Sequence, residues 1–330
     1  MDYEDQTGIG EKSDRPVFEE RGEERMNRAC MHVDGRTQCF AVWGHPIGHT
    51  FSPMIHELFI KECGDNMAYL AFDVAPDALQ DALRGAWAMG FGGINLTIPH
   101  KERVIPYLVG LDPLARKVGA VNTLKRTEEG FYGYNTDVYG MQSQLRTNGI
   151  YLEGQDVVIL GAGGAAKSAL CVCQMEGARS VAIYNRTYDR AAELIRHYEE
   201  VSRGETLPNM RAVKYDELLR MPHPYVIQTT PAGMLGVADL LPIPEALFYD
   251  SILYGADVVF NPKDTPFLEK VRAHGGKGAD GLSMLYYQAQ KAFEIWKQIS
   301  FSEEASERMK AQFLEWAEDY FHAVDDCTRW

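Results

Sequence analysis

The chain has 330 residues, a length at which two domains are the usual arrangement. Hydrophobic residues make up 45% of it and charged residues 24%, proportions typical of a soluble globular protein. The net charge of -14 excludes the basic surface that nucleic-acid binding requires and disfavours binding to anionic membranes.

The six cysteines form no C-x-x-C pair, and no histidine cluster accompanies them. We therefore expect no metal site, no disulfide framework and a reducing, cytoplasmic environment. Residues 1–36 are acidic and polar, without the apolar segment of a signal peptide and with too few large apolar residues to form a core. We expect them to form a flexible extension. No apolar stretch is long enough to span a bilayer.

Strands and helices alternate along the first part of the chain. In chain order we expect a strand at Gln38–Gly44, a helix at 53–63, a strand at 67–74, a helix at 76–89 and a strand at 91–98. Pro53 suits the first position of its helix, and Ser52 is the natural N-cap. The alternation predicts a mostly parallel sheet.

A second alternation follows a domain joint that we expect at residues 146–155. The string DVVILGAGGAAKSAL predicts a strand, a glycine-rich turn and a helix. The later expected elements are a strand in SVAIYNRT, a helix at 191–200, strands in YVIQTT and ADVVF, and helices at 284–299 and 303–324. We expect the glycine-rich segment 274–281 to recross the joint. The predicted fold is α/β, with a first domain at 37–147, completed by helices within 282–330, and a second at 148–281.

The string GAGGAA, residues 161–166, follows an apolar strand and matches G-x-G-x-x-A, the small-residue form of the dinucleotide fingerprint. Gly161 permits the tight turn, Gly163 lets the backbone approach a pyrophosphate, and Ala166 keeps helix and strand close. The N–H groups and the dipole at the helix start favour phosphate. Glycines also end strands for plain turn reasons, but the strand before and the helix after favour a cofactor site.

The next strand ends in Asn185, Arg186 and Thr187, where an NAD site usually has an acidic residue for the ribose 2′-hydroxyl. A guanidinium pairs well with a 2′-phosphate, so we expect NADP(H) and not NAD(H). Arg190 is either a second cation for this phosphate or a solvated arginine on the helix face.

Four polar strings outside the turn, GHPIGHTFSP, NLTIPHK, GAVNT and GYNTD, look like loop ends that carry chemistry. Together with GAGGAA, NRT, QTTPAGM, NPKDTPFL and GLSMLYYQAQKAF, they make residues 40–299 resemble the shikimate dehydrogenase family. The resemblance implies an α/β substrate domain, a Rossmann-type NADP-binding domain and a cleft between them. It also implies reversible NADP-linked oxidation of shikimate to 3-dehydroshikimate, a step toward chorismate and the aromatic amino acids. Breakdown of plant acids stays open as the biological role.

In the family that the sequence resembles, the residues matching Lys101 and Asp137 form the catalytic pair. Removing hydride from the carbon requires a base that takes the hydroxyl proton. A lysine in a partly dry cleft has its ammonium form destabilised, and a neighbouring carboxylate orients it. Without the resemblance, Lys101 reads as a solvated surface charge and Asp137 as the N-cap of the following helix.

The resemblance also implies residues that bind the substrate and the cofactor. Those matching substrate-binding positions are Thr50, Ser52, Asn95, Thr97, Asn122 and Gln288. Those matching cofactor positions, beyond the ones named above, are Ala162, Gly164, Ala165, Thr230, Gly233, Met234 and Gly281. Ordinary structural roles also fit several of them, such as an exposed glutamine at Gln288 or gap-filling by Met234.

Two residues depart from the family pattern. Thr50 stands where the family usually has serine, and Phe260 stands where it usually has a tyrosine whose hydroxyl reaches the substrate. We therefore expect weaker binding than in typical members or a shifted preference. A paralogue that acts on quinate, with NADP or NAD, is the first alternative, and a non-catalytic sensor of ring acids is the second. The sequence leaves the oligomeric state open, with a homodimer as one candidate.

Overall fold

The computed structural model describes residues 33–327 except 49, 235–236 and 238–239, and it describes side chains as far as Phe321. The extension expected at residues 1–36 therefore lies outside the described residues, apart from 33–36. There, Asp34 accepts a hydrogen bond of 2.9 Å from the side chain of Asn66, which directly precedes the second strand. This bond attaches the residues before the first strand to the first sheet.

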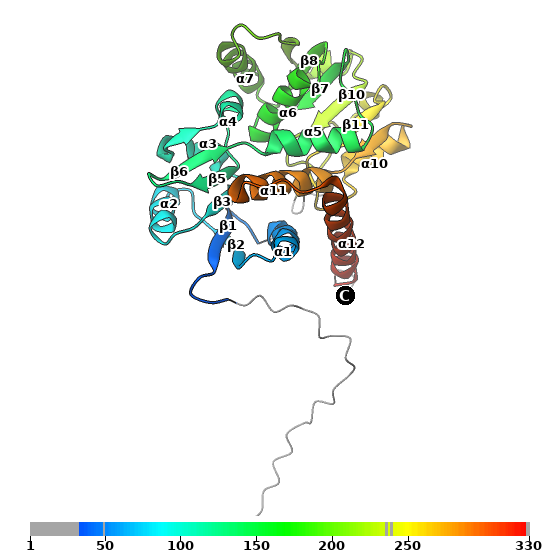
Figure 1. Cartoon of the computed structure of the whole chain (residues 1–330). Helices are drawn as coiled ribbons and strands as arrows, with labels where there is room; N and C mark the ends of the chain where they lie inside the picture. The colour runs from blue at the N-terminus through cyan, green and yellow to red at the C-terminus, as the bar shows by residue number, and fades with distance from the viewer. Residues whose placement is uncertain (1–32, 49, 235–236, 238–239, 328–330) are drawn as a thin grey trace, which may run out of the picture. The chain divides into compact units, whose positions relative to one another are not determined.

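Six strands form the first sheet, in the order β2-β1-β3-β5-β6-β4 (Figure 1). Only β5 runs antiparallel to its neighbours, so the prediction of a mostly parallel sheet is confirmed. The first three strands were predicted, whereas the short strands β4 to β6 were not. The strands are β1 (Gln38–Gly44), β2 (Met67–Asp73), β3 (Gly93–Leu96), β4 (Gly110–Leu111), β5 (Thr123–Arg126) and β6 (Phe131–Tyr134).

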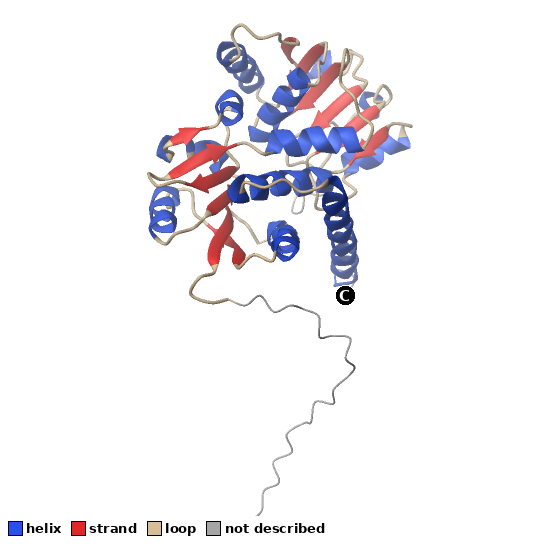
Figure 2. Cartoon of the chain, viewed as in Figure 1, coloured by secondary structure: helices blue, strands red, loops and turns tan. Residues whose placement is uncertain are grey.

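Six further strands form the second sheet, in the order β12-β11-β10-β7-β8-β9, and every pairing is parallel (Figure 2). Within residues 274–281, where we expected the chain to recross the joint, the strand β12 pairs with β11 before α11 begins at Gly281. The order changes direction at β7, which carries the glycine turn at its carboxyl end. The strands are β7 (Asp156–Leu160), β8 (Ser180–Tyr184), β9 (Asn209–Val213), β10 (Tyr225–Gln228), β11 (Tyr254–Asp257) and β12 (Lys277–Ala279).

Helices connect and cover these strands, and α11 packs against α1 and α5 (Figure 1). Those attached to the first sheet are α1 (Ser52–Cys63), α2 (Leu79–Ala88), α3 (His100–Arg103), α4 (Pro113–Val118) and α5 (Asp137–Thr147). The later ones are α6 (Gly164–Met175), α7 (Tyr188–Val201), α8 (Tyr215–Leu218), α9 (Ala246–Tyr249), α10 (Pro266–Ala273), α11 (Gly281–Lys297) and α12 (Glu303–Cys327), with a 3₁₀ turn at Ile105–Tyr107.

Two N-cap predictions are wrong, and for the same reason. α1 begins at Ser52 and α5 begins at Asp137, so each polar side chain lies one residue inside its helix. Acceptors earlier in the chain bind the first helical N–H groups instead. The hydroxyl of Thr50 lies 3.2 Å from the backbone nitrogen of Ser52, and the carboxamide oxygen of Asn135 lies 3.2 Å from that of Val138. The Asp137 carboxylate is thereby left available for other partners.

Helix α5 contributes to the core of the second sheet although it follows the strands of the first. Its buried residues Val138, Met141 and Leu145 pack in one apolar cluster with residues of β7, β8 and α6. The side chain of Gln144 donates hydrogen bonds to two backbone carbonyls at the ends of β11 and β12, those of Asp257 at 2.8 Å and Asp280 at 2.7 Å. These bonds tie α5 to the carboxyl ends of two strands of the second sheet.

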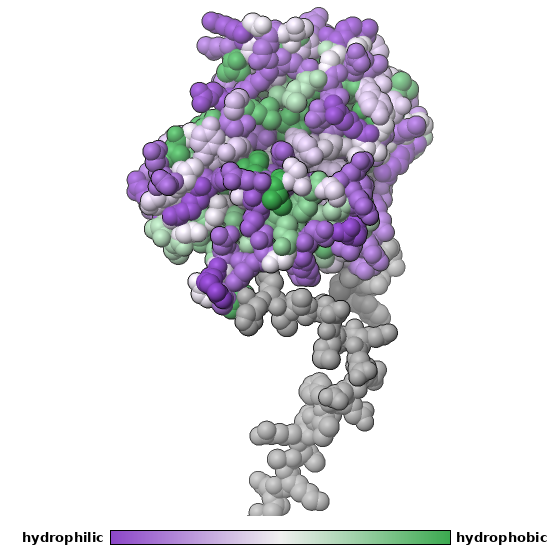
Figure 3. Space-filling model, in the orientation of Figure 1, coloured by the Kyte–Doolittle hydropathy of each residue, from purple (hydrophilic) through white to green (hydrophobic). Residues whose placement is uncertain are grey.

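The face in Figure 3 is coloured mainly hydrophilic, in keeping with the strongly acidic composition. Over the described residues, no helix has both the length and the apolar character needed to cross a bilayer.

One buried carboxyl group stands out at the end of β11. The Asp257 side chain is fully buried, and it accepts hydrogen bonds from the Val259 N–H at 2.9 Å and the Thr265 hydroxyl at 2.7 Å. Burial outweighs these bonds and raises the pKa of Asp257 to about 7 from its ordinary 3.8. Between those two pH values the folded chain holds a proton that the unfolded chain has lost. The contribution of Asp257 to stability is therefore full below the lower value and falls as pH rises toward the upper one.

We predict that Asp257→Asn removes this pH-dependent contribution, because an amide has no proton to lose. The wild type should lose free energy of unfolding relative to the variant as the pH rises from about 4 to about 8. Urea denaturation of both proteins across this range measures the difference, and Asp77→Asn, at an exposed site, serves as the control. A wild-type-minus-variant difference that stays constant with pH contradicts the prediction.

Candidate active site

Lys101 and Asp137 lie together at the carboxyl edge of the first sheet. Lys101 is on the short helix α3 that follows β3, and Asp137 opens α5 after β6. Because β3 and β6 both run antiparallel to β5 between them, their carboxyl ends share one edge. The Lys101 amine donates to one Asp137 oxygen at 2.6 Å, and the lysine and aspartate side chains are 21% and 6% exposed. The ion pair is thus mostly shielded from water, with the lysine as its more accessible member.

Asn122 fixes the other oxygen of the Asp137 carboxylate. Its Nδ2 lies 2.9 Å from that oxygen, 2.9 Å from the Thr136 hydroxyl and 3.2 Å from the Gln288 carboxamide oxygen. Its Oδ1 accepts the Thr136 backbone N–H at 2.7 Å, which orients the amide. The carboxylate is therefore held between the Lys101 amine and the Asn122 amide.

A second layer of hydrogen bonds lies behind Asn122. Asn95 is buried, and its Nδ2 donates to the Thr123 hydroxyl at 3.0 Å, while its Oδ1 accepts from the Tyr69 hydroxyl at 2.7 Å. The Thr123 hydroxyl in turn lies 3.3 Å from the Asn122 Oδ1. Asn95, which the resemblance assigns to substrate binding, is thus already bonded within the protein and supports Asn122.

Sequence reasoning did not identify Tyr69, Thr123 or Thr136. Thr123 could be identified only from the pairing of β3 with β5, which places it opposite Asn95. The Tyr69 ring stacks on the buried imidazole of His56, with centroids 3.9 Å apart. Burial lowers the pKa of His56 to about 3, so this ring is neutral and acts as apolar support.

Thr50 and Ser52 lie on the loop that leads into α1. Their hydroxyl oxygens are 3.2 Å apart, and the Ser52 side chain is buried. Burial raises the pKa of the Tyr69 phenol well above its usual range, and the adjacent Ser52 hydroxyl acts in the opposite direction. Ser52 and Asn95 therefore both approach the Tyr69 hydroxyl.

Thr97 follows β3 at the same edge of the first sheet. A Cβ on Gly44, at the end of β1, would lie 2.5 Å from the Thr97 methyl group. Gly44 therefore leaves space for Thr97 beside β1. The two residues follow adjacent parallel strands, which is how they come to share this edge.

The glycine turn lies against the stem of Lys101. Gly161 has a φ of +116°, and a Cβ there would lie 2.5 Å from the Thr229 hydroxyl, so only glycine fits. Gly163 has an extended backbone, and a Cβ there would meet no atom within 4 Å, which leaves open space above the backbone. A Cβ on Gly164, the first residue of α6, would lie 3.8 Å from Cδ of Lys101. The turn and the catalytic candidates therefore occupy one region.

The turn residues Ala162 and Ala165 are half-buried, and Ala166 is fully buried between helix and strand. Lys167, one residue further along α6, forms an ion pair of 2.9 Å with Glu102, the neighbour of Lys101 on α3. This contact joins the start of α6 to the helix that carries the lysine.

Asn185, Arg186 and Thr187 follow β8 at the carboxyl edge of the second sheet. The Asn185 amide donates to the Thr187 carbonyl at 2.8 Å and shapes the turn into α7. Arg186 and Arg190 are exposed, and among the described residues neither forms an ion pair with an acid. An unpaired guanidinium at this position is suited to an incoming phosphate.

The remaining cofactor candidates follow β10 and β12. The Gln228 side chain shapes the first of these loops, because it accepts the Thr230 N–H at 2.7 Å. Gly233 has a φ of +88°, which favours glycine, and the Met234 N–H donates to the Pro231 carbonyl at 3.1 Å. A Cβ on Gly281 would lie 2.6 Å from the Val258 carbonyl, so packing alone accounts for that glycine.

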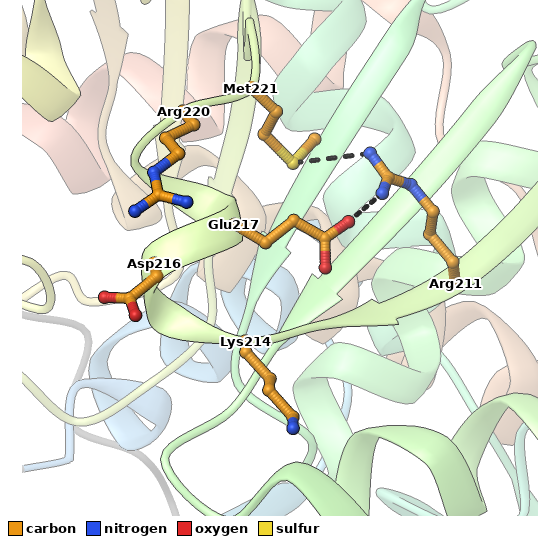
Figure 4. A pocket seen from close by; sticks show the side chains of 6 residues that line it. All are labelled: Arg211, Lys214, Asp216, Glu217, Arg220 and Met221. Carbon is orange, nitrogen blue, oxygen red and sulfur yellow. Dashed lines mark hydrogen bonds and ion pairs between the residues drawn. The ribbon is translucent and has the colours of Figure 1, made fainter.

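A pocket of about 500 Å³ lies elsewhere, beside β9 and α8 (Figure 4). The Arg211 guanidinium in it is paired with Glu217 and lies 3.6 Å from the Met221 sulfur. This pocket contains none of the residues predicted from the sequence. Its lining consists of Arg211, Lys214, Asp216, Glu217, Arg220 and Met221.

Comparison with known proteins agrees with this arrangement. Residues 42–124 match the shikimate dehydrogenase substrate binding domain, and residues 144–217 match the family described as shikimate / quinate 5-dehydrogenase. A shikimate dehydrogenase (NADP(+)) of Methanosarcina mazei is 39% identical over 283 residues, which cover 84% of this chain and 98% of the relative.

Two solved structures are similar over most of the chain. A chorismate mutase/shikimate 5-dehydrogenase fusion protein from Clostridium acetobutylicum has 30% identity and a TM-score of 0.77, with 86% of this chain and 99% of that chain covered. A shikimate 5-dehydrogenase from Thermus thermophilus, solved with NADP(H) and shikimate, has 31% identity and a TM-score of 0.73, with 84% and 100% covered. From its sequence and its fold, the chain belongs to the shikimate dehydrogenase family.

Proposed function

We propose that the protein is an NADP-dependent shikimate dehydrogenase that interconverts shikimate and 3-dehydroshikimate. The observation that carries the proposal is the Lys101 amine, 2.6 Å from the Asp137 carboxylate and beside the glycine turn at Gly164. The family and the NADP-dependent relative support the same reaction. The role that fits best is a step in the synthesis of chorismate and the aromatic amino acids.

In the proposed mechanism Lys101 handles the proton of the reacting hydroxyl group. During oxidation its neutral amine accepts this proton as the carbon loses hydride, and during reduction its ammonium returns the proton to the oxygen. Asp137 stabilises the ammonium form and orients the amine, while Asn122 keeps the carboxylate from turning away. Bound NADP supplies the hydride acceptor or donor. The Thr50 and Ser52 hydroxyls are the proposed donors to the substrate carboxylate, with Thr97 and Gln288 near the ring.

The residues present fit a bound dinucleotide. Gly163 has open space above its backbone, and the N–H groups at the start of α6 face phosphate with a favourable helix dipole. The Arg186 side chain is free to pair with a 2′-phosphate, which supports NADP over NAD. The proposed cofactor-binding residues also include Asn185 and Thr187 beside it, and the loop with Thr230, Gly233 and Met234.

We further propose two domains, a substrate domain at 37–147 completed by helices within 282–330 and a cofactor domain at 148–281, each built around one of the two sheets.

A cytoplasmic location is supported by four described cysteines that are free thiols. A homodimer is supported by the edge strand β2, where the side chains of Leu70 and Phe72 are exposed.

Quinate is the second candidate substrate, and Phe260 is the observation that favours it. Its ring packs on Phe51, with centroids 5.4 Å apart, where the family pattern would supply a tyrosine hydroxyl for the substrate. Quinate carries a hydroxyl on the ring carbon that bears its carboxylate, whereas shikimate has a ring double bond there. The contacts of Thr50 and Phe260 therefore bear directly on the choice between the two acids.

The function is tested by measuring kcat/KM for shikimate and quinate, each with NADP+ and NAD+. We expect the highest value for shikimate with NADP+, because the turn, Arg186 and the catalytic pair fit that combination. A higher value for quinate would assign the protein to the quinate-acting paralogues. Absence of turnover with both acids would contradict an enzyme and favour a ring-acid sensor.

We predict that Lys101→Ala lowers kcat by at least about 100-fold, because it removes the amine to which we assign the transfer of the hydroxyl proton. The Kd for NADP+, measured by fluorescence titration, should stay within about twofold of wild type, since the turn N–H groups and the Arg186 side chain, which we assign to the phosphates, are unchanged. Lys117→Ala is the matched control, because Lys117 is also a largely shielded lysine paired with a carboxylate, that of Glu205. A Lys101→Ala enzyme with most of its rate would refute the mechanism.

We predict that Arg186→Gln raises the KM for NADP+ by about 10- to 100-fold, the usual range for losing a charge-assisted bond to phosphate. The KM for NAD+ should change by less than about twofold, because NAD+ has no 2′-phosphate. Arg179→Gln is the control, since Arg179 precedes β8 at the opposite edge of the sheet and is paired with Asp156. Equal changes in the KM values for the two cofactors would show that Arg186 does not bind the 2′-phosphate.

A further inference from the structure

Phe51 lies between Thr50 and Ser52, the two residues whose hydroxyls we assign to the substrate carboxylate. Its side chain is 2% exposed, although it belongs to a loop. Four aromatic rings surround it, with centroids 5.0–5.8 Å away. We call this group the Phe51 cluster, and its members are Phe51, Phe260, Trp316, Tyr320 and Phe321.

Three of the five rings come from α12, the last helix. The Trp316 and Tyr320 rings meet the Phe51 ring edge-on, at 5.1 Å and 5.0 Å. Edge-to-face contacts at these distances are favourable beyond the apolar area that they bury. They also fix the direction of the Phe51 side chain, since an edge-on contact constrains ring orientation as well as position.

Helix α12 is itself firmly attached to the first sheet's helices. One guanidinium nitrogen of Arg308 donates to both carboxylate oxygens of Glu62 in α1, at 2.8 Å each, and the Ser306 carbonyl accepts the Tyr286 hydroxyl of α11 at 2.8 Å. The buried side chain of Phe313 stacks on Tyr286. The helix therefore packs behind the loop that carries Thr50 and leads into α1 at Ser52.

Helix α12 also contacts the loop after β11 in the second sheet. Lys263 of that loop forms an ion pair of 2.7 Å with Glu318 on α12. Phe260, from the same loop, contacts Phe51 directly at 5.4 Å. Phe51 is thus held by one aromatic ring from the second sheet's side and by three from the last helix.

We propose that Trp316 and Tyr320 are positioning residues for substrate binding. They hold the Phe51 ring, and through it they keep the neighbouring Thr50 and Ser52 hydroxyls oriented for the carboxylate of the ring acid. The inference rests on the proposed function, because it assigns those hydroxyls to the substrate. It gives α12 a role in binding although none of its residues is required to touch the substrate.

The test compares the variants Trp316→Leu and Tyr320→Leu with wild type. Each should raise the KM for shikimate by about 5- to 10-fold, since it removes an aromatic contact that orients the loop. The kcat and the KM for NADP+ should stay within about twofold, because Lys101, Asp137 and the glycine turn are untouched. Tyr320→Phe keeps the ring and should restore nearly the wild-type KM.

Phe301→Leu is the matched control. The Phe301 ring packs on Phe59 of α1 and on Phe293 of α11, at 5.5 Å and 5.8 Å. The variant therefore loses similar aromatic packing, but outside the Phe51 cluster. It should leave the KM for shikimate unchanged. If Phe301→Leu raises this KM as much as Trp316→Leu does, the effect is a general loss of packing and the inference is overturned.

A double-mutant cycle separates this inference from the proposed function. Ser52→Ala alone should raise the KM for shikimate, and adding Trp316→Leu to it should raise the KM by much less than in the wild-type background. Fully additive effects of the two substitutions on the KM would overturn this inference and leave the proposed function standing. If Ser52→Ala and Thr50→Val both leave the KM unchanged, the proposed carboxylate site itself fails. Should Trp316→Leu not fold, the cycle with Tyr320→Leu gives the same decision.

Discussion

The site depends on how the Asp137 carboxylate is held. One oxygen receives the Lys101 amine and the other receives the Asn122 amide, at 2.6 Å and 2.9 Å. A carboxylate with only one partner could rotate and release the amine, whereas two partners fix both its plane and its distance. The buried hydrogen bonds behind Asn122 hold it in a fixed position relative to the strands of the first sheet. The ion pair is thereby held in a fixed position as well. The first sheet therefore acts as the frame for the Lys101–Asp137 ion pair.

The second sheet supplies a different kind of constraint. Its all-parallel order changes direction at β7, and the glycine turn follows that strand, which is where dinucleotides bind in open α/β sheets. The turn lies beside the stem of Lys101, and Lys167 on α6 pairs with Glu102 on α3. A cofactor held at this turn would therefore have its phosphates next to the elements that carry the lysine.

The sequence predicted the family, the two parallel-rich sheets and the main helices, because their periodicity and turn residues are local. It also identified Lys101, Asp137 and Asn122, which the structure brings together. It could not identify Tyr69 or Thr123, since their roles depend on cross-strand register with Asn95 and not on any local pattern. The strands β4, β5 and β6 were missed because each has only two to four residues. The N-cap errors arose because the acceptors of the first helical N–H groups, Asn135 and Thr50, each lie two residues before the predicted cap.

Helix α5 presents Asp137 at its first residue, yet its apolar face belongs to the core around the second sheet. Its Gln144 is bonded to the backbone there, at the carbonyls of Asp257 and Asp280. A genetic exchange between two relatives at residue 147 would keep α5 with its own first sheet and mismatch its apolar face against the core around the second sheet. A working exchange would therefore have to carry α5 together with the residues of β7, β8 and α6 that pack on it, although the same helix also presents Asp137 to Lys101.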